Sequence, residues 1–377
     1  MRMSGTGKQY GVSAVVLAAG MSRRMGTPKQ LLRIGGETIL GRTLKNVRAS
    51  NVSEIVLVLG HAAESVEKTI ATDDLKIVRN PEYQDGMGTS LRAGLAAVDA
   101  DAEGALIILA DQPWVVSETL SRLIALHQES RPQIIIPMHR GFRGNPVLLD
   151  RSVFPEVQAL HGDVGCRAIF GDHTENILKL EVDDPGILLD IDSRDELEKL
   201  NAGGKCKGTA QYAGLAMLET RDDIVAGRPE LVLVGRNALV RALAKFGRVL
   251  SFNIILVDPF LGLIEFPEAD GILRCMDFSL LPSAAERYAV VASRGQFDEE
   301  AVTQALKADC SYIALLANKK RAQEVIKSLR AQSIAPEKLA RVHAPAGLEI
   351  GAETPEEIAL SIMAQIVALR CKEKVEG

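Results

Sequence analysis

The 377-residue sequence lacks the features that mark several large classes of protein. Its five cysteines form no C-x-x-C pair, so neither a disulfide framework nor a zinc site is predicted. No apolar run approaches the roughly 20 residues that a membrane-spanning helix needs, and residues 1–11 lack the apolar core of a signal peptide. These absences predict a protein that stays in the reducing cytoplasm.

Net basic charge is missing as well. The formal net charge of −5 and the pI of about 5.8 exclude a nucleic-acid binder that works through its overall field, because neutralising phosphates requires a basic face. Aromatic residues make up only 4%, but 47% hydrophobic and 25% charged residues are typical of a globular chain with sizeable cores. At this length we expect about two domains.

What the sequence does contain is a regular alternation of strand-like and helix-like segments. Strands are predicted in the first half at SAVVLAAG, SEIVLVLG, LKIVRN, GALIILADQP, QIIIPMH, PVLLD and GILLDID, and in the second half at ELVLVG, NIILVDPF, YAVVAS and SYIALLAN. This pattern is typical of βαβ units in a parallel sheet covered on both faces. The predicted fold class is α/β, with two doubly wound, Rossmann-like domains at residues 1–200 and 229–377 and a linker at 201–228.

Two predicted helices begin with a capping box, in which a hydroxyl residue is followed three positions later by an acidic one. Ser193 and Glu196 predict a short helix that closes the first domain. Thr354 and Glu357, with Pro355 at the first helical position, predict the start of the last helix.

The loop after the first strand has the composition of a polyphosphate site. It lies within VVLAAGMSRRMGTPKQ, residues 15–30, and the carboxyl ends of strands are where open α/β sheets bind ligands. Gly20 lets the backbone approach a ligand, and Arg24 and Lys29 supply charge to phosphate oxygens. The stretch matches neither a P-loop nor G-x-G-x-x-G, which argues against an ordinary ATPase and against an NAD enzyme.

Three aspartates are candidate ligands for a divalent metal. Asp111 ends GALIILAD, while Asp190 and Asp192 stand two apart in GILLDID, where the alternation of a strand places both side chains on one face. A single aspartate at a strand end is more often a turn former. Three such residues behind a basic glycine loop favour a metal site, and hard oxygen ligands suit Mg²⁺.

The string A-A-G-x-S-x-R-M-G-x-P-K resembles the nucleotide-binding loop of the MobA-like NTP transferases, in particular the molybdenum cofactor cytidylyltransferases (MocA-like). The resemblance covers residues 13–200 and implies a nucleotide-diphospho-sugar-transferase-like fold with a mainly parallel sheet. Ala19 and Pro28 stand where guanylyl relatives usually have Gly and Asp, which favours CTP over GTP. The nucleotide-binding residues that the resemblance implies are Ala18, Ala19, Gly20, Arg24, Lys29, Gly88, Ser90 and Asp111.

Further motifs of that family follow in order along the first domain. D-Q-P at residues 111–113 and D-I-D-S at 190–193 match its metal-binding segments, GMGTSLRAG at 86–94 matches its base and ribose segment, and RGNPV at 143–147 matches a loop facing the acceptor. The resemblance therefore implies acceptor binding by Arg143 and Asn145, catalysis by Arg24, Lys29 and Asp111, and Mg²⁺ on the three aspartates. The implied reaction is transfer of CMP from CTP to Mo-molybdopterin, with release of pyrophosphate.

The second domain has the spacing of a dinucleotide fold but not its fingerprint. Asp258 ends a strand 23 residues after Gly235, where a ribose-binding acid would stand, but Asn237 and Val240 occupy positions that require Gly and Gly or Ala. We therefore expect a Rossmann-like scaffold without tight NAD binding.

The C-terminal residues 229–371 resemble the xanthine dehydrogenase accessory family (XdhC/CoxI-like), through VVASRGQFDEEAV, YIALLANKKR and RVHAPAGLEIG. Members of that family help to deliver or sulfurate the molybdenum cofactor for molybdenum hydroxylases. The resemblance implies a recipient of the xanthine dehydrogenase type and makes Gly235, Asp258 and His343 candidate contacts for a ligand of this domain.

Two other interpretations stay open. One is transfer of a nucleotide to a sugar phosphate, although such enzymes usually have G-x-G-T-R in the first loop. The other is a non-catalytic chaperone that binds and delivers the molybdenum cofactor. Arg24, Lys29, Asp111 and Asp190 argue against the chaperone, because a scaffold has no use for them.

Overall fold

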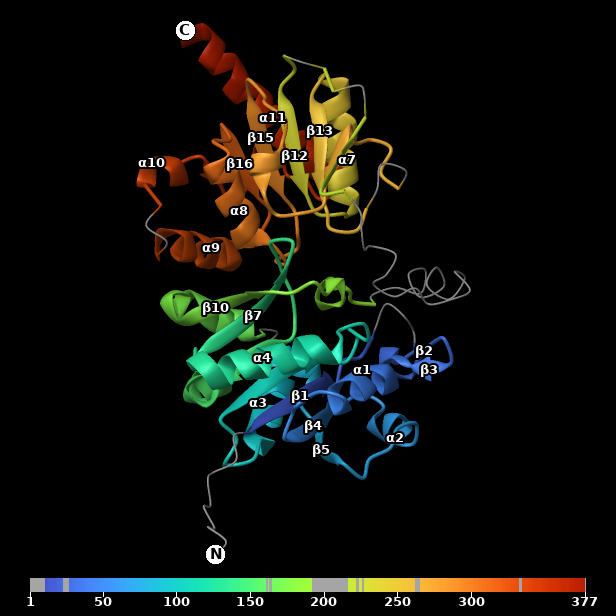
Figure 1. Cartoon of the computed structure of the whole chain (residues 1–377). Helices are drawn as coiled ribbons and strands as arrows, with labels where there is room; N and C mark the ends of the chain where they lie inside the picture. Colours follow the sequence, from blue (N-terminus) through green and yellow to red (C-terminus); the bar gives the residue numbers. More distant parts are fainter. Residues whose placement is uncertain are drawn as a thin grey trace, which may run out of the picture. The chain divides into compact units, whose positions relative to one another are not determined.

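The computed structural model describes residues 11–22, 27–160, 162, 165–191, 216–221, 224–225, 227–261, 265–331 and 334–376. The chain divides into two compact units (Figure 1): unit 1 is Met1–His139 with Gly144–Ala213, and unit 2 is Arg140–Arg143 with Gly214–Gly377. Both are α/β units, which confirms the predicted fold class. The predicted helix at Ser193 and most of the linker 201–228 lie outside the described residues, so the domain boundaries stay predictions.

The main sheet of unit 1 has seven strands among the described residues, in the order β10-β7-β9-β6-β1-β4-β5, and β8, whose residues are counted with unit 2, pairs with β7. Along the order β10-β7-β9-β6-β1-β4-β5, neighbours pair in parallel except at β9, which is antiparallel to β6 and β7. The strands are β1 (Val12–Ala18), β4 (Glu54–Leu59), β5 (Leu75–Arg79), β6 (Gly104–Leu109), β7 (Ile134–His139), β8 (Phe142–Arg143), β9 (Val147–Asp150) and β10 (Ile177–Glu181), with a separate ribbon of β2 (Arg33–Ile34) and β3 (Glu37–Thr38).

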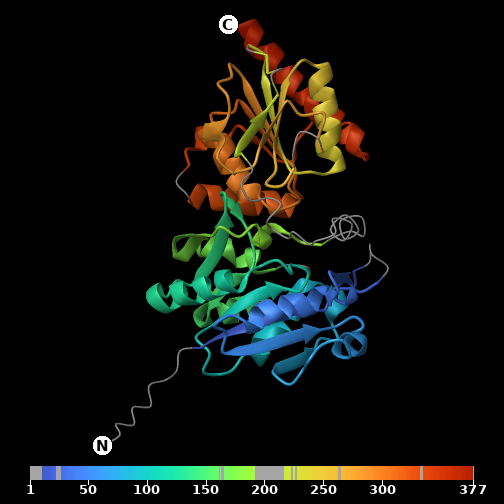
Figure 2. The same cartoon turned by 45° about the vertical axis from the view of Figure 1, so that its right-hand side comes forward.

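Helices cover both faces of this sheet (Figures 1 and 2). Helices α3 and α5 pack together on one face, and α1 contacts α4 on the other. The α-helices are α1 (Ile39–Arg48), α2 (Ala63–Glu67), α3 (Met87–Ala97), α4 (Ser117–Ser130) and α5 (Phe154–Gln158). The 3-10 helices are η1 (Lys29–Leu31), η2 (Tyr83–Asp85), η3 (Arg151–Val153), η4 (Cys166–Asp172), η5 (Thr174–Asn176) and η6 (Pro185–Leu188).

The strand order reverses direction at β1. From β1 the chain adds β4 and β5 on one side, and then β6 on the other. At such a switch point two connections leave in opposite directions, which opens a crevice beyond the carboxyl end of the strand. The loop that follows Ala18 begins at this crevice.

Helix α3 lies unusually close to the sheet. A side-chain carbon at Gly94 would stand 2.4 Å from Val15 Cγ1 on β1 and 2.9 Å from Val58 Cγ2 on β4. Since protein interiors are close-packed, such distances leave room only for hydrogen at this position. Glycine at position 94 therefore sets how near the whole helix comes to the two central strands.

The strand predicted at GILLDID is wrong. Residues Pro185–Leu188 form η6 instead, and residues 189–191 are not in a strand. Proline has no N–H for a ladder and has the φ of a first helical residue, and the Asp184 side chain accepts a hydrogen bond from Gly186 N at 2.9 Å. The argument that strand alternation places Asp190 and Asp192 on one face therefore fails.

Unit 2 contains a seven-stranded sheet in the order β11-β14-β13-β12-β15-β16-β17 among the described residues. All neighbours are parallel except β11, which is antiparallel to β14. The strands are β11 (Leu218–Thr220), β12 (Glu230–Val234), β13 (Asn253–Val257), β14 (Gly271–Leu273), β15 (Arg287–Val291), β16 (Tyr312–Leu315) and β17 (Val342–His343). The order reverses at β12, as it does at β1 in unit 1.

The helices of unit 2 also lie on both faces of its sheet. Helix α7 packs beside α11 (Figure 2), and α8 packs beside α9. The helices are α7 (Ala238–Val249), α8 (Asp298–Lys307), α9 (Lys319–Ala331), α10 (Pro336–Leu339) and α11 (Pro355–Glu376), with the 3-10 helix η8 (Phe278–Leu280). Of the helices described here, including the 22-residue α11, none has the length and apolar character that crossing a bilayer requires.

The capping box predicted for the last helix is confirmed. Glu357 N donates to Thr354 Oγ1 at 3.2 Å, and Thr354 N donates to Glu357 Oε2 at 2.9 Å. Each side chain thus satisfies a backbone donor that the first turn leaves unpaired. The hydrogen bonds that Thr354 N and Glu353 N donate to the carboxylate lower the pKa of Glu357.

Candidate active site

A cavity of about 860 Å³ lies at the carboxyl end of β1. It is lined by the ends of β1 and β6, the loop at residues 19–22, residues 29 and 30, η2 and the start of α3. The predicted site residues among its lining are Ala19, Gly20, Lys29, Ser90 and Asp111. Segments more than 80 positions apart in the sequence thus meet around one space, at the switch point of the sheet.

The first loop is held at both ends by side chains. Ser22 Oγ accepts a hydrogen bond from Lys29 N at 3.0 Å, which ties the two described ends of the loop together. Gln30 is 5% exposed, and its Nε2 donates to Ala18 O at 2.7 Å and to Gly20 O at 3.4 Å. These bonds fix the backbone that faces the cavity. Arg24 lies outside the described residues.

Lys29 and Asp111 meet at the wall of the cavity. Lys29 Nζ lies 3.3 Å from Asp111 Oδ2, and the two side chains are only 17% and 29% exposed. The lysine comes from the start of η1 and the aspartate from the turn after β6. A cation and a carboxylate therefore share one partly buried position, with 82 residues between them in the chain.

The predicted metal and acceptor segments converge on η6. Ile187 O accepts from Asn145 N at 3.0 Å and from Gln112 Nε2 at 3.4 Å, while Gln112 Nε2 also donates to Asp190 Oδ1 at 3.2 Å. Ile191 N donates to Asp111 O at 3.2 Å. The structure thus brings Asp190 and Asn145 to the turn that carries Asp111, although by a 3-10 turn and not by the predicted strand.

The donor set for a metal is incomplete in the described part of the chain. There, no three His, Cys, Asp or Glu side chains are grouped closely enough to hold an ion. Asp192, the third predicted ligand, lies outside the described residues. Asp111 and Asp190 supply hard carboxylate oxygens on two adjoining segments, which is the chemistry that Mg²⁺ prefers.

Other predicted residues of unit 1 stand back from the cavity. Ala18 ends β1 but is not in the cavity lining, and its carbonyl is bound by Gln30. Gly88, near the start of α3, is also not in the lining. Their part in nucleotide binding stays a prediction.

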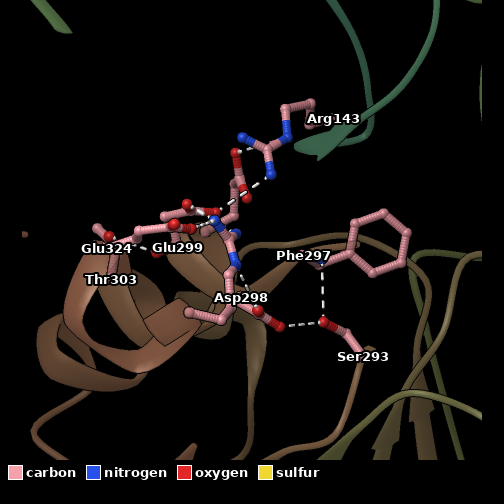
Figure 3. A network of polar contacts seen from close by, with 9 residues as sticks. Arg143, Ser293, Phe297, Asp298, Glu299, Thr303 and Glu324 are labelled. Carbon is pink, nitrogen blue, oxygen red and sulfur yellow. Dashed lines mark hydrogen bonds and ion pairs between the residues drawn. The ribbon is translucent and has the colours of Figure 1, made fainter. Parts of the chain in front are cut away.

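Arg143 is counted with unit 2, in a network of charged side chains (Figure 3). Its side chain is 6% exposed, and its Nη2 donates to Glu299 Oε2 at 3.1 Å. Arg321 Nη2 binds the other oxygen of Glu299 at 2.8 Å, and Arg321 Nε binds Asp298 at 3.2 Å. The guanidinium of Arg143 is thus engaged by a carboxylate of α8, and its predicted contact with the acceptor stays a prediction.

In unit 2, the side chain of Asn237 fills the space beside the glycine loop that begins at Gly235. Gly235 has a φ of +117°, and an added side-chain carbon would lie 2.6 Å from Ala292 O. Asn237 Oδ1 accepts from Val240 N at 3.1 Å, and its Nδ2 donates to Ala292 O at 2.7 Å. Asn237 therefore caps α7 at the place where a pyrophosphate would lie in a dinucleotide fold.

The side chain of Asp258 also accepts hydrogen bonds from the backbone. It is 4% exposed, and its Oδ1 accepts from Phe260 N at 2.9 Å and from Leu261 N at 3.0 Å. Burial raises the pKa of this carboxyl, and the nearby cations Arg236 and Arg274 oppose the rise. An acid that binds a ribose needs a carboxylate that can accept from the ribose hydroxyls. The Asp258 carboxylate accepts from two backbone amides instead, so Asn237 and Asp258 do not fit a dinucleotide.

Replacing Asp258 with asparagine is expected to raise the thermal midpoint at pH 7. The asparagine keeps the acceptor for both amides and removes a charge that burial disfavours. In the folded protein the pKa of Asp258 is raised, so the protonated carboxyl stabilises the fold. This stabilisation is fully present below the pKa of the unfolded chain, about 3.9, and is lost as pH rises through the pKa of the folded protein. The gain should therefore shrink near pH 4. Thermal unfolding of both proteins at the two pH values measures it, and a lower midpoint for Asp258→Asn at pH 7 would contradict the assignment.

His343 is packed against an aromatic ring. Its imidazole stacks on Tyr312 with centroids 4.5 Å apart, and burial lowers its pKa. Tyr312 OH in turn donates to Gln365 Oε1 at 2.6 Å. The stacked histidine has a packing role in the structure, and ligand contact by it stays a prediction.

Sequence reasoning missed two buried amides next to the cavity. Gln30 holds the first loop, and Asn80, 4% exposed, binds the hydroxyls of Thr89 and Ser90. Asn80 begins N-P-E-Y-Q-D-G, a stretch whose composition predicts only a turn. No spacing rule marks either residue, because both act through contacts that form only in the fold.

Comparisons with known proteins give two family matches. Residues 14–177 match the MobA-like NTP transferase domain, and residues 231–366 match the XdhC Rossmann domain. The purine catabolism protein PucB of Bacillus subtilis is 31% identical over 195 residues, a match that covers 49% of this chain and 93% of PucB. The chain belongs to the MobA-like NTP transferase family. This MobA-like chain is a nucleotidyltransferase that also carries an XdhC Rossmann domain, so both predicted resemblances and the predicted enzyme class are confirmed.

Two relatives come from Escherichia coli K12. The molybdenum cofactor cytidylyltransferase is 28% identical over 188 residues, which covers 49% of the MobA-like chain and 93% of that enzyme. The uncharacterized protein YqeB is 33% identical over 150 residues, which covers 38% of the chain. The chain matches only 28% of the length of YqeB.

Proposed function

We propose that unit 1 transfers CMP from CTP to the terminal phosphate of Mo-molybdopterin and releases pyrophosphate. The observation that carries the proposal is the contact of Lys29 Nζ with Asp111 Oδ2, 3.3 Å apart at the wall of the cavity beyond β1. A cation for phosphate oxygens and a carboxylate for a metal are the two groups that nucleotidyl transfer needs at one place. The E. coli relative named for this activity matches over 93% of its length.

The preference for CTP rests on small residues of the first loop. Ala19 lines the cavity, and Pro28 directly precedes η1, at the positions where the sequence pattern of guanylyl transferases has Gly and Asp. We propose that this loop selects cytosine over guanine.

We propose Mg²⁺ as the divalent metal, held by Asp111 and Asp190, with Asp192 as the third ligand. Bound there, Mg²⁺ would offset negative charge on the attacking and leaving oxygens. Gln112 Nε2 donates to Asp190 Oδ1 at 3.2 Å and so orients one of these carboxylates. Such supporting bonds matter because ligands that are held in place bind metals more tightly.

The residues of the chain then act by position and charge. The terminal phosphate of the acceptor is ionised near neutral pH, since its second pKa is about 6, so no general base is required. One of its oxygens attacks the α-phosphorus of CTP, the bond to the β-phosphate breaks, and pyrophosphate leaves with the electron pair. Lys29 stabilises the charge that develops on these oxygens, and the loop at residues 18–22, held by Gln30, brings backbone N–H groups to the phosphates.

We further propose that the XdhC domain, residues 229–377, passes the product to a molybdenum hydroxylase of the xanthine dehydrogenase type. Synthesis in the first predicted domain, residues 1–200, and delivery by the second would keep a labile dinucleotide on one chain. Asn145, held against η6 through its backbone, is the proposed acceptor contact in unit 1.

Incubation of the full chain with Mg²⁺ and molybdenum cofactor, with CTP, GTP or ATP in separate reactions, tests the proposal. We expect pyrophosphate release with CTP to exceed that with GTP or ATP by at least about tenfold, the effect of one lost polar contact. A parallel series with a sugar 1-phosphate as acceptor should release none. Equal rates for the three nucleotides, or turnover only with the sugar phosphate, would overturn the proposed substrates.

A further inference from the structure

Asn80 lies just behind the wall of the cavity, at the end of β5. It is 4% exposed and is not in the cavity lining. Its Oδ1 accepts from Glu82 N at 2.9 Å. Because a backbone N–H can only donate, this bond fixes the orientation of the amide and leaves its two N–H groups pointing the other way.

Those two N–H groups bind the first hydroxyls of α3. Nδ2 lies 2.8 Å from Thr89 Oγ1 and 2.9 Å from Ser90 Oγ. Thr89 accepts from Asn80 and donates its own proton to the carbonyls of Glu82 and Gly86, both at 2.9 Å. Asn80 and Thr89 therefore have all their side-chain polar groups paired within the protein.

Ser90 differs from Thr89 in one respect. It also accepts from Asn80, so its single proton must point away from the amide. Within the described part of the chain, no group accepts that proton. Ser90 is 5% exposed and lines the cavity, so the remaining direction for its O–H is towards the cavity.

We propose that Asn80 is a positioning residue for nucleotide recognition. It fixes the Ser90 hydroxyl as a donor towards the cavity, for an acceptor atom on the base or ribose of the nucleotide. The inference rests on the proposed function only in that the cavity binds a nucleotide. It adds that affinity for the nucleotide depends on an amide that lies outside the cavity lining.

Asn80→Asp tests this assignment with almost no change of shape. The carboxylate still accepts from Glu82 N, but it cannot donate, so the Ser90 proton turns towards it and leaves the cavity. We expect the Kd for CTP, measured by calorimetry without acceptor, to rise about tenfold. In turnover, KM should rise with kcat almost unchanged, because the lost contact is made equally in the ground and transition states.

A double-mutant cycle separates positioning from a general structural effect. Ser90→Ala should also raise the Kd about tenfold. In the double variant, Asn80→Asp should then add nothing, since the hydroxyl through which it acts is gone. Independent effects that multiply to about a hundredfold would overturn the inference.

Asn80→Ala gives a second discriminating comparison. This variant loses three hydrogen bonds and side-chain volume, so a purely structural role predicts that it harms binding at least as much as Asn80→Asp. Under the inference it harms binding less, because the freed Ser90 hydroxyl can still rotate towards the ligand. A larger Kd for Asn80→Ala than for Asn80→Asp, at equal thermal midpoints, would refute positioning.

Asn253→Asp is the matched control. Asn253 is a buried amide of unit 2, 6% exposed, that exchanges hydrogen bonds with the backbone of Val225. Its replacement buries a carboxylate in the same way, and the Kd for CTP should stay as in the parent. A parent protein that binds none of CTP, GTP and ATP would overturn the proposed function together with the inference. If the parent binds CTP and Asn80→Asp binds it with the same Kd, the inference alone is overturned.

Discussion

Lys29→Ala is expected to lower kcat for pyrophosphate release by about 100- to 1,000-fold, the usual effect of removing one preorganised charge from a transition state. Lys29 reaches the cavity from η1 and lies 3.3 Å from Asp111. Both side chains line the cavity, where water can solvate Asp111 once the lysine is removed, so the cost to folding should stay near that of an exposed ion pair, about 0–1 kcal/mol. The loss should therefore appear in catalysis and not in the thermal midpoint. Steady-state kinetics with CTP, together with thermal unfolding, measures both quantities.

Lys45→Ala is the control for that variant. Lys45 is 69% exposed and pairs with Glu37 on the surface, so its removal also takes one positive charge from unit 1. Its kcat should equal that of the parent. If Lys29→Ala retained more than about a tenth of the parental kcat, well above the range expected for a transition-state charge, the assigned role of Lys29 would be wrong.

Asp111→Asn is expected to reduce kcat at least about 1,000-fold, because a catalytic metal supplies several kcal/mol and each 1.36 kcal/mol is tenfold in rate. The amide keeps the shape of the side chain but loses the charge of a predicted metal ligand. Binding of Mn²⁺, followed by its paramagnetic resonance signal, should weaken in parallel. This second measurement separates loss of the metal from loss of the Lys29 contact, which Lys29→Ala removes while Asp111 remains.

Asp73→Asn serves as the control for the aspartate. Asp73 is exposed, and its replacement changes the net charge of unit 1 by the same amount. Metal affinity and kcat should both match the parent. An Asp111→Asn protein that binds Mn²⁺ as tightly as the parent would remove Asp111 from the proposed metal site.

The central strands of both units were predictable because they depend on local pattern, whereas β10, β11, β14 and β17 lie outside the strands that were predicted. The buried runs of β1, β4, β6, β12 and β13 are almost entirely apolar, as parallel strands covered on two faces must be. The start of α11 was predictable for the same reason, since the bonds between Thr354 and Glu357 lie within one turn.

The failure at GILLDID shows what local pattern leaves out. The run is apolar enough for a strand, but Asp184 caps it and also accepts from Val116 N at 3.0 Å and from Thr119 Oγ1 at 2.8 Å. These partners lie 65 or more positions away in the chain, at the start of α4. The competing hydrogen bonds are tertiary, so the apolar run alone could not decide between strand and 3-10 turn.

The charged residues of the candidate site were predictable, but the neutral side chains that hold the site in place were not. Lys29 and Asp111 follow from a glycine-rich loop and a strand end, because both positions have a fixed place in an α/β sheet. Gln30 and Asn80 are neutral, lie in unremarkable local sequence, and act on residues that the fold brings to them. Amides of this kind become visible only when the partners of each buried polar atom are traced.

Glycine at position 94 connects the proposed nucleotide binding at Ser90 with the packing of α3 against the sheet. Ser90 and Gly94 are one turn apart on α3, and Gly94 touches the valines of the two central strands. Any residue larger than glycine there must lift the helix and carry the serine hydroxyl away from the nucleotide. Variants with altered nucleotide choice can therefore arise in the hydrophobic interior, far from any atom that a substrate reaches.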